Sequence, residues 1–128
     1  MRIGILSQFR ERSLSGIPKV VAGTVSELKK LTVQDDLLYM GEEPFLPVQL
    51  PFVDIPYAGW EKYHLDFCLH GNDMDVLHSF YYAFHYDNPR CKKILTIHDL
   101  IHVAHPEWFF KTSNDYFSGP LKECAKKV

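Results

Sequence analysis

Several features that would mark other classes of protein are scarce in this chain of 128 residues. It has only three cysteines, Cys68, Cys91 and Cys124, which are odd in number and too far apart for a zinc knuckle. No stretch approaches the roughly 20 apolar residues of a membrane-spanning helix. The apolar core of the N-terminal segment is too short for a secretory signal. We therefore expect reduced thiols and a cytoplasmic location, and the composition leaves open an association with the inner face of a membrane.

The chain also lacks an excess of charge of one sign. Its net charge is −2 at pH 7 and its lysines and arginines are scattered, which argues against nucleic acid as a partner. Hydrophobic residues make up 46% and charged residues 23%, which is typical of a globular domain. The length predicts a single domain over residues 1–128.

The first half of the chain contains a strand, a helix and a second strand. Residues 2–7, "RIGILS", are typical of a buried central strand. Residues 17–31, "IPKVVAGTVSELKKL", place apolar side chains at helical spacing, with Pro18 in the first turn. A strand is predicted over residues 35–40 and ends before Gly41. A crossover of this kind makes the two strands parallel.

The second half continues the alternation of strands and helices. The prolines between residues 44 and 56 favour an edge strand around Val48–Val53, and residues 60–70 are predicted to be a helix. Further strands are predicted over residues 75–79 and 93–98, and a short helix near Pro106. The fold class is therefore α/β, a Rossmann-like open parallel sheet with helices on both faces.

Ligands bind such a sheet at the carboxyl ends of its strands, where the strand order 3-2-1-4-5 reverses. This rule selects residues from three separate stretches. The first strand leads through Ser7 to Gly16, and the strand 75–79 leads to Ser79, Phe80 and Tyr81. The strand 93–98 delivers His98 and Asp99 to the same edge.

Gly16 and His98 are the two residues for which we expect a function most directly. Gly16 precedes the first helix, where backbone N–H groups attract anions such as phosphate, although it could merely form the turn. No G-x-G-x-x-G pattern is present, which argues against a dinucleotide cofactor. The imidazole of His98 could hold a sugar hydroxyl or stabilise charge in a transition state. Asp99 could orient that imidazole or cap the following turn.

Three histidines that follow the strand predicted over residues 93–98, counting the one at its end, could form a metal site. His98, His102 and His105 have helical spacing, and together with Asp99 they would suit a metal-dependent phosphohydrolase. Pro106 limits any helix that could carry all three histidines, and we expect no metal site. We expect His78 to be a packed core histidine.

Four segments resemble the N-terminal domain of the glycosyltransferase family 4 enzymes, which have the GT-B fold. They are "MRIGILS", "SGIPKVVAGTVSEL", "DVLHSFYY" and "KKILTIHDLIHVAHPEWF". They stand in the order in which the family has its opening strand, its glycine loop with the first helix, a D-[VI]-[VI]-H-[ST]-P strand and a T-[IV]-H-D-[LI]-x-P segment. The chain departs from the family at Pro18, Lys19 and Phe80, where a second glycine, an arginine and a proline are common.

The resemblance implies a retaining transfer of a sugar from a nucleotide-sugar, such as a UDP- or GDP-sugar, to a glycan or lipid-linked acceptor, without a tightly held metal or other cofactor. It gives His98 the role of positioning the sugar, and Gly16 and Lys19 the contact with the donor phosphates. Asp99, Ser79, Phe80 and Tyr81 would lie on the acceptor side. Most of the donor would bind a second domain with an E-x7-E pattern, which this sequence lacks. We therefore expect a piece of a longer protein that is inactive alone, or alternatively a stand-alone α/β binding module.

Overall fold

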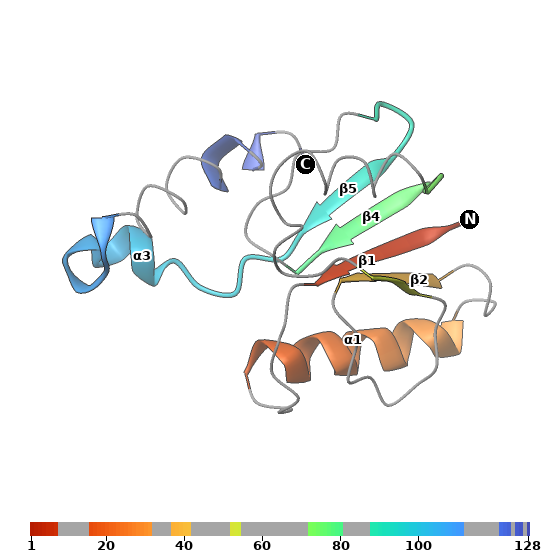
Figure 1. Ribbon diagram of the computed structural model, residues 1–128, viewed down its shortest axis with the longest axis horizontal. Coiled ribbons are helices and arrows are strands. Elements are labelled where there is room, and N and C mark those ends of the chain that lie inside the picture. Colours follow the sequence, from red (N-terminus) through yellow and green to blue (C-terminus); the bar gives the residue numbers. More distant parts are fainter. Residues whose placement is uncertain are drawn as a thin grey trace.

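The computed structural model describes residues 1–7, 16–31, 37–41, 52–54, 72–80, 88–111, 121–123, 125, 126 and 128. Five strands form one sheet, with one long helix packed on a face of it (Figure 1). The elements are β1 (Ile3–Ser7), α1 (Ile17–Leu31), β2 (Leu37–Gly41), β3 (Phe52–Asp54), β4 (Val76–Ser79), β5 (Lys92–Leu95), the one-turn helix α3 (Ile101–Ala104) and the 3₁₀ turn η3 (Pro106–Trp108). No helix in these ranges has both the length and the apolarity to cross a bilayer.

All neighbouring strands of the sheet run parallel, in the order β3-β2-β1-β4-β5. The α/β class and the strand order predicted from the sequence are thus confirmed. The chain first builds the sheet outward from β1 through β2 to β3 and then returns to the other side of β1 with β4. The order therefore reverses at β1, and the carboxyl ends of β1 and β4 border that reversal.

The core lies between the sheet and α1. The apolar stripe of α1 packs against one face of the sheet, and the buried members of this cluster are Ile3, Ile5, Val21, Val25, Leu37, Tyr39 and Phe80. Side chains alternate along a strand, so Leu6, Met40 and Leu77 lie on the opposite face. These three are also completely buried, so both faces of the sheet are covered. Each such side chain contributes about 1.5–3 kcal/mol of transfer free energy.

The elements differ from their predicted bounds mainly after β5. Helix α1 has the predicted bounds. The edge strand expected around Val48–Val53 overlaps β3 at Phe52 and Val53, and residues 48–51 lie outside the described residues. The strand expected over residues 35–40 is β2, which includes Gly41 and pairs with β3. The strand expected over residues 93–98 ends at Leu95, because its neighbour β4 ends at Ser79 and the register pairs Ser79 with Leu95. The chain then leads through residues 96–100 to the short helix α3. The helix expected over residues 60–70 lies outside the described residues.

Candidate functional site

The carboxyl ends of the strands face the same edge of the molecule as the first turn of α1. In Figure 1 the strands β1, β4 and β5 point to the left, α1 begins at its left-hand end, and the chain leaves β5 to the left toward α3. The stretches that carry Gly16 and His98 therefore belong to one edge of the sheet, as predicted from the strand order. Tyr81, which was expected at this edge, lies outside the described residues.

Gly16 forms the turn that leads into α1. Its φ of 59° is in the left-handed region, which favours glycine, and it is exposed with no atom within 4 Å of where a Cβ would lie. Its carbonyl oxygen accepts hydrogen bonds from the N–H groups of Lys19 and Val20, at 3.2 and 3.3 Å. Pro18 has no N–H, so the first-turn donors that a ligand could reach are those of Gly16 and Ile17. The Lys19 side chain is exposed.

Ser7 ends β1 on the face that α1 covers. Its side chain is completely buried, and within the described part of the chain its hydroxyl oxygen has no hydrogen-bond partner. A buried hydroxyl without a partner costs about 1–3 kcal/mol. Gly41 lies opposite Ser7 in the register of β1 and β2, and a Cβ there would collide with the Ser7 carbonyl oxygen. The sequence offers no signal for this orphan hydroxyl beyond its place at the end of the first strand.

The two residues that end β4 are both buried. Ser79 is completely buried, and the alternation of β4 places it on the face away from α1. Phe80 is 2% exposed and belongs to the core cluster beneath the sheet edge. Its backbone N–H donates to the Leu6 carbonyl oxygen at 2.9 Å and extends the pairing of β4 with β1. Phe80 thus supplies its ring to the core and its own carbonyl oxygen to the site.

His98 lies in the segment after β5 and is half-buried. Its Nε2 is 3.2 Å from the Phe80 carbonyl oxygen. A carbonyl oxygen only accepts, so Nε2–H donates, and in the neutral ring Nδ1 is then the nitrogen that can accept a hydrogen bond from a hydroxyl. The imidazole also stacks beside the Phe80 ring, with centroids 6.3 Å apart. These contacts hold His98 at the carboxyl end of β4 although it stands three residues beyond β5.

Asp99 supports the turn that follows His98. Its Oδ1 accepts a hydrogen bond from the Ile101 N–H at 3.1 Å, which is the geometry of an Asx turn leading into α3. Of the two roles that the sequence left open, this contact corresponds to capping. The carboxylate is exposed.

The other histidines are distributed over separate aromatic partners. His102 packs on Phe109 with ring centroids 3.7 Å apart, and His105 stacks on Trp108 at 4.0 Å. Within the described ranges, no three His, Cys, Asp or Glu side chains converge to hold a metal ion. The arrangement therefore lends no support to a metal-dependent phosphohydrolase built on the histidines after β5.

His78 connects β4 to the segment that carries His98. Its Nε2 and the Thr96 hydroxyl are 2.8 Å apart, and its ring stacks on Phe80 with centroids 4.1 Å apart. Burial lowers the pKa of His78 below the ordinary histidine value. The side chain is half-buried, consistent with the packed position expected from the sequence. The sequence did not indicate Thr96, although hydroxyl side chains are frequent partners of histidine.

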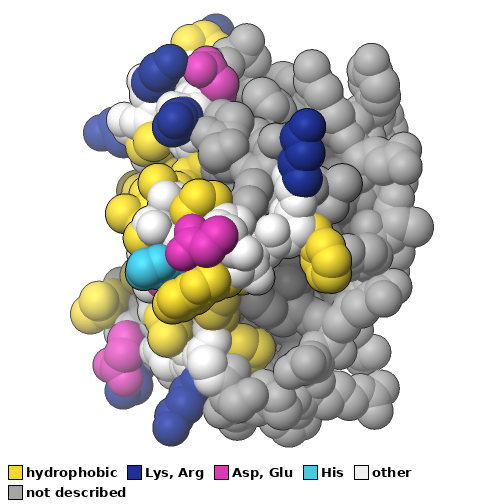
Figure 2. Space-filling model, turned by 90° about the vertical axis from the view of Figure 1, so that its left-hand side faces the viewer, with side chains coloured by type: hydrophobic (Ala, Val, Ile, Leu, Met, Phe, Trp, Pro, Cys, Tyr) yellow, Lys and Arg dark blue, Asp and Glu magenta, His cyan; other side chains and the backbone are white. Residues whose placement is uncertain are grey.

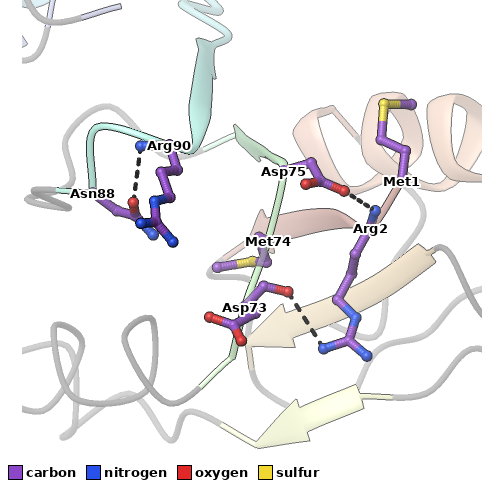
Figure 3. Close-up of a pocket in the computed structure, with 7 residues that line it drawn as sticks. All are labelled: Met1, Arg2, Asp73, Met74, Asp75, Asn88 and Arg90. Carbon is purple, nitrogen blue, oxygen red and sulfur yellow. Dashed lines mark hydrogen bonds between the residues drawn. The ribbon is translucent and has the colours of Figure 1, made fainter.

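A polar hollow lies at the opposite, amino-terminal edge of the sheet (Figure 3). It has a volume of about 640 Å³ and is lined by Met1, Arg2, Asp73, Met74, Asp75, Asn88 and Arg90. Asp75 accepts a hydrogen bond from the Arg2 backbone N–H at 2.7 Å, and the Arg2 guanidinium donates to the Asp73 carbonyl oxygen at 3.3 Å. No motif in the sequence marks this hollow, and it stands on the edge away from Gly16 and His98.

The segment from Ile97 to Phe110 exposes large hydrophobic side chains at the carboxyl edge of the sheet. Six of its large hydrophobic side chains are exposed by 39% or more: Ile97, Leu100, Ile101, Val103, Trp108 and Phe110. Figure 2 shows the face at this end of the molecule, where hydrophobic side chains surround an acidic and a histidine side chain.

Comparisons with known proteins add no assignment to this geometry. No protein-family model, no curated protein and no solved structure matches the chain.

Proposed function

We propose that this chain is the N-terminal, acceptor-side domain of a retaining glycosyltransferase with the GT-B fold. The reaction would move a sugar from a nucleotide-sugar, such as a UDP- or GDP-sugar, to the hydroxyl of a glycan or a lipid-linked acceptor. A second domain of the same enzyme would hold most of the donor.

The observation that carries the proposal is the place of Gly16 and His98 in the fold. Both stand at the carboxyl edge of a parallel sheet whose order reverses at β1, which is where open α/β sheets bind their ligands. The four segments that resemble the enzyme family fall on β1, α1, β4 and the stretch from β5 to η3.

Each half of the site would serve a different part of the reaction. The leaving diphosphate carries negative charge, and the first-turn N–H groups beside Gly16 together with Lys19 would stabilise it. The His98 imidazole, oriented by the Phe80 carbonyl oxygen, would hold a hydroxyl of the transferred sugar. A preoriented group of this kind needs no reorganisation when charge develops in the transition state.

The test is a sugar-transfer assay on the protein that carries residues 1–128 together with a donor-binding domain. We expect His98→Ala to lower kcat by about 10²-fold, the usual cost of one lost preoriented donor or acceptor, while the circular dichroism spectrum stays unchanged. His102→Ala is the matched control, since His102 is a histidine of the same segment whose ring packs on Phe109. Near wild-type turnover in His98→Ala would remove this residue from the mechanism.

A further inference from the structure

The turn formed by α3 and η3 presents a flat aromatic surface in a fixed orientation. The indole of Trp108 is stacked on the imidazole of His105, with centroids 4.0 Å apart and the planes within 7° of parallel. Trp108 is nevertheless 63% exposed. Since one face of the indole lies against His105, the exposed area belongs to the other face and the edges of the ring.

Contacts within the turn hold this pair in place. His105 Nδ1–H donates to Glu107 Oε1 at 3.2 Å, which fixes the plane of the imidazole. The Trp108 backbone N–H donates to the His105 carbonyl oxygen at 3.1 Å, and the His105 N–H donates to Ile101 O at 2.8 Å. The open face of the indole is therefore preoriented, which reduces the entropy lost when a ligand packs on it.

The charges around the indole decide which class of ligand it suits. Between Ile97 and Lys111 the chain carries two carboxylates, Asp99 and Glu107, against one amine, Lys111. An anionic membrane surface or a nucleic acid would need an excess of lysine and arginine, which this segment lacks. A neutral ring with apolar C–H groups on its face and hydroxyls on its rim matches an open indole face bordered by imidazole and carboxylate groups.

We propose that the exposed face of Trp108 is a stacking platform for a neutral sugar ring, and that His105 and Glu107 position it. The assignment of that ring to the acceptor glycan rests on the proposed function, because the platform belongs to the same chain segment as His98. The stacking itself requires only the geometry of the turn.

The experiment measures binding of neutral oligosaccharides to the 128-residue chain. The sequence has two tryptophans, so Trp60→Phe leaves Trp108 as the single indole reporter. Neutral gluco-, manno- and galacto-configured oligosaccharides are titrated while the indole emission is recorded. Saturation-transfer NMR on the unsubstituted chain repeats the measurement without any substitution. We expect a saturable change with at least one oligosaccharide series.

Two substitutions distinguish stacking on Trp108 from nonspecific hydrophobic binding. Trp108→Ala should weaken oligosaccharide affinity by roughly tenfold, the upper range for loss of one aromatic stacking partner. Phe110→Ala is the matched control, because Phe110 is a neighbouring aromatic side chain that is 85% exposed. Its removal should leave the affinity within about twofold of the starting value, within the range of an exposed substitution.

Three results would overturn the inference. The first is that no oligosaccharide gives a saturable response. The second is that Trp108→Ala leaves the oligosaccharide affinity unchanged. The third is that the indole emission responds instead to phosphatidylcholine or phosphatidylserine vesicles, or to self-association of the chain. His98→Ala separates this failure from failure of the proposed function, since it should lower kcat for sugar transfer by about 10²-fold and leave oligosaccharide binding at Trp108 intact.

Discussion

The Nε2 of His98 lies 3.2 Å from the carbonyl oxygen of Phe80, and this contact joins the segment after β5 to the end of β4. A second contact, between the His78 ring and the Thr96 hydroxyl at 2.8 Å, joins the same two segments two residues earlier. Together they fix the position of the imidazole beyond the end of the strand ladder. The proposed role of His98 depends on this fixed position of its imidazole.

The turn at Gly16 provides a prediction about stability. Gly16→Ala should lower the free energy of unfolding by about 1–2 kcal/mol, because a Cβ at positive φ is strained even where space is open. Gly23, an exposed glycine inside α1 whose added Cβ would also meet open space, is the matched control. Gly23→Ala should raise the free energy of unfolding by about 0.5–1 kcal/mol. Urea denaturation of both variants measures the difference, and effects of the same sign would contradict the left-handed turn.

The orphan hydroxyl of Ser7 gives a second prediction. Ser7→Ala should raise the free energy of unfolding by about 1 kcal/mol, since it removes a buried donor that has no described partner. Ser79→Ala removes the same atom from a serine that is equally buried but does have an interaction partner, and should lower the free energy of unfolding by about 1 kcal/mol. Thermal and urea unfolding measure both. Destabilisation of similar size in the two variants would mean that the Ser7 hydroxyl is satisfied.

His78 predicts how stability depends on pH. Burial lowers its pKa in the folded state below the ordinary value of 6.5, so the unfolded chain binds a proton more readily. The contribution of neutral, buried His78 to the free energy of unfolding is complete above about pH 6.5. It is lost as the pH falls through the lowered pKa of the folded state. His78→Gln should reduce the difference in the free energy of unfolding between about pH 8 and about pH 5. An unchanged difference in this variant would show that other groups cause the pH dependence.

Much of the fold followed from the spacing of apolar residues. Residues 17–31 carry apolar side chains along one face at helical spacing. Helix α1 has those bounds and packs this face against the sheet. The strand order followed from the alternation of strands and helices. The order also identified the edge of the sheet to which the segments with Gly16 and His98 belong, and the functional roles of these two residues stay predictions.

The remaining features depend on partners that no local pattern specifies. Ile97 continues the apolar run of β5, yet β5 ends at Leu95 and the Ile97 side chain is 42% exposed. The sequence allowed Asp99 to cap the turn or to orient His98, and no local pattern specified its contact with the Ile101 N–H. The stack of His105 on Trp108 depends on the turn at Pro106, and apolar composition alone would have suggested a buried tryptophan.

The most direct test is an NMR titration of the ¹⁵N-labelled chain with UDP, GDP and their sugar conjugates, because NMR detects the weak binding expected of one domain alone. If nucleotide-sugars bind at the carboxyl edge of the sheet, the backbone resonance of Gly16 and the imidazole resonances of His98 should shift together and saturate at one ligand concentration. Shifts confined to the hollow around Arg2 and Arg90, or no shift at millimolar ligand, would contradict binding at this edge of the sheet.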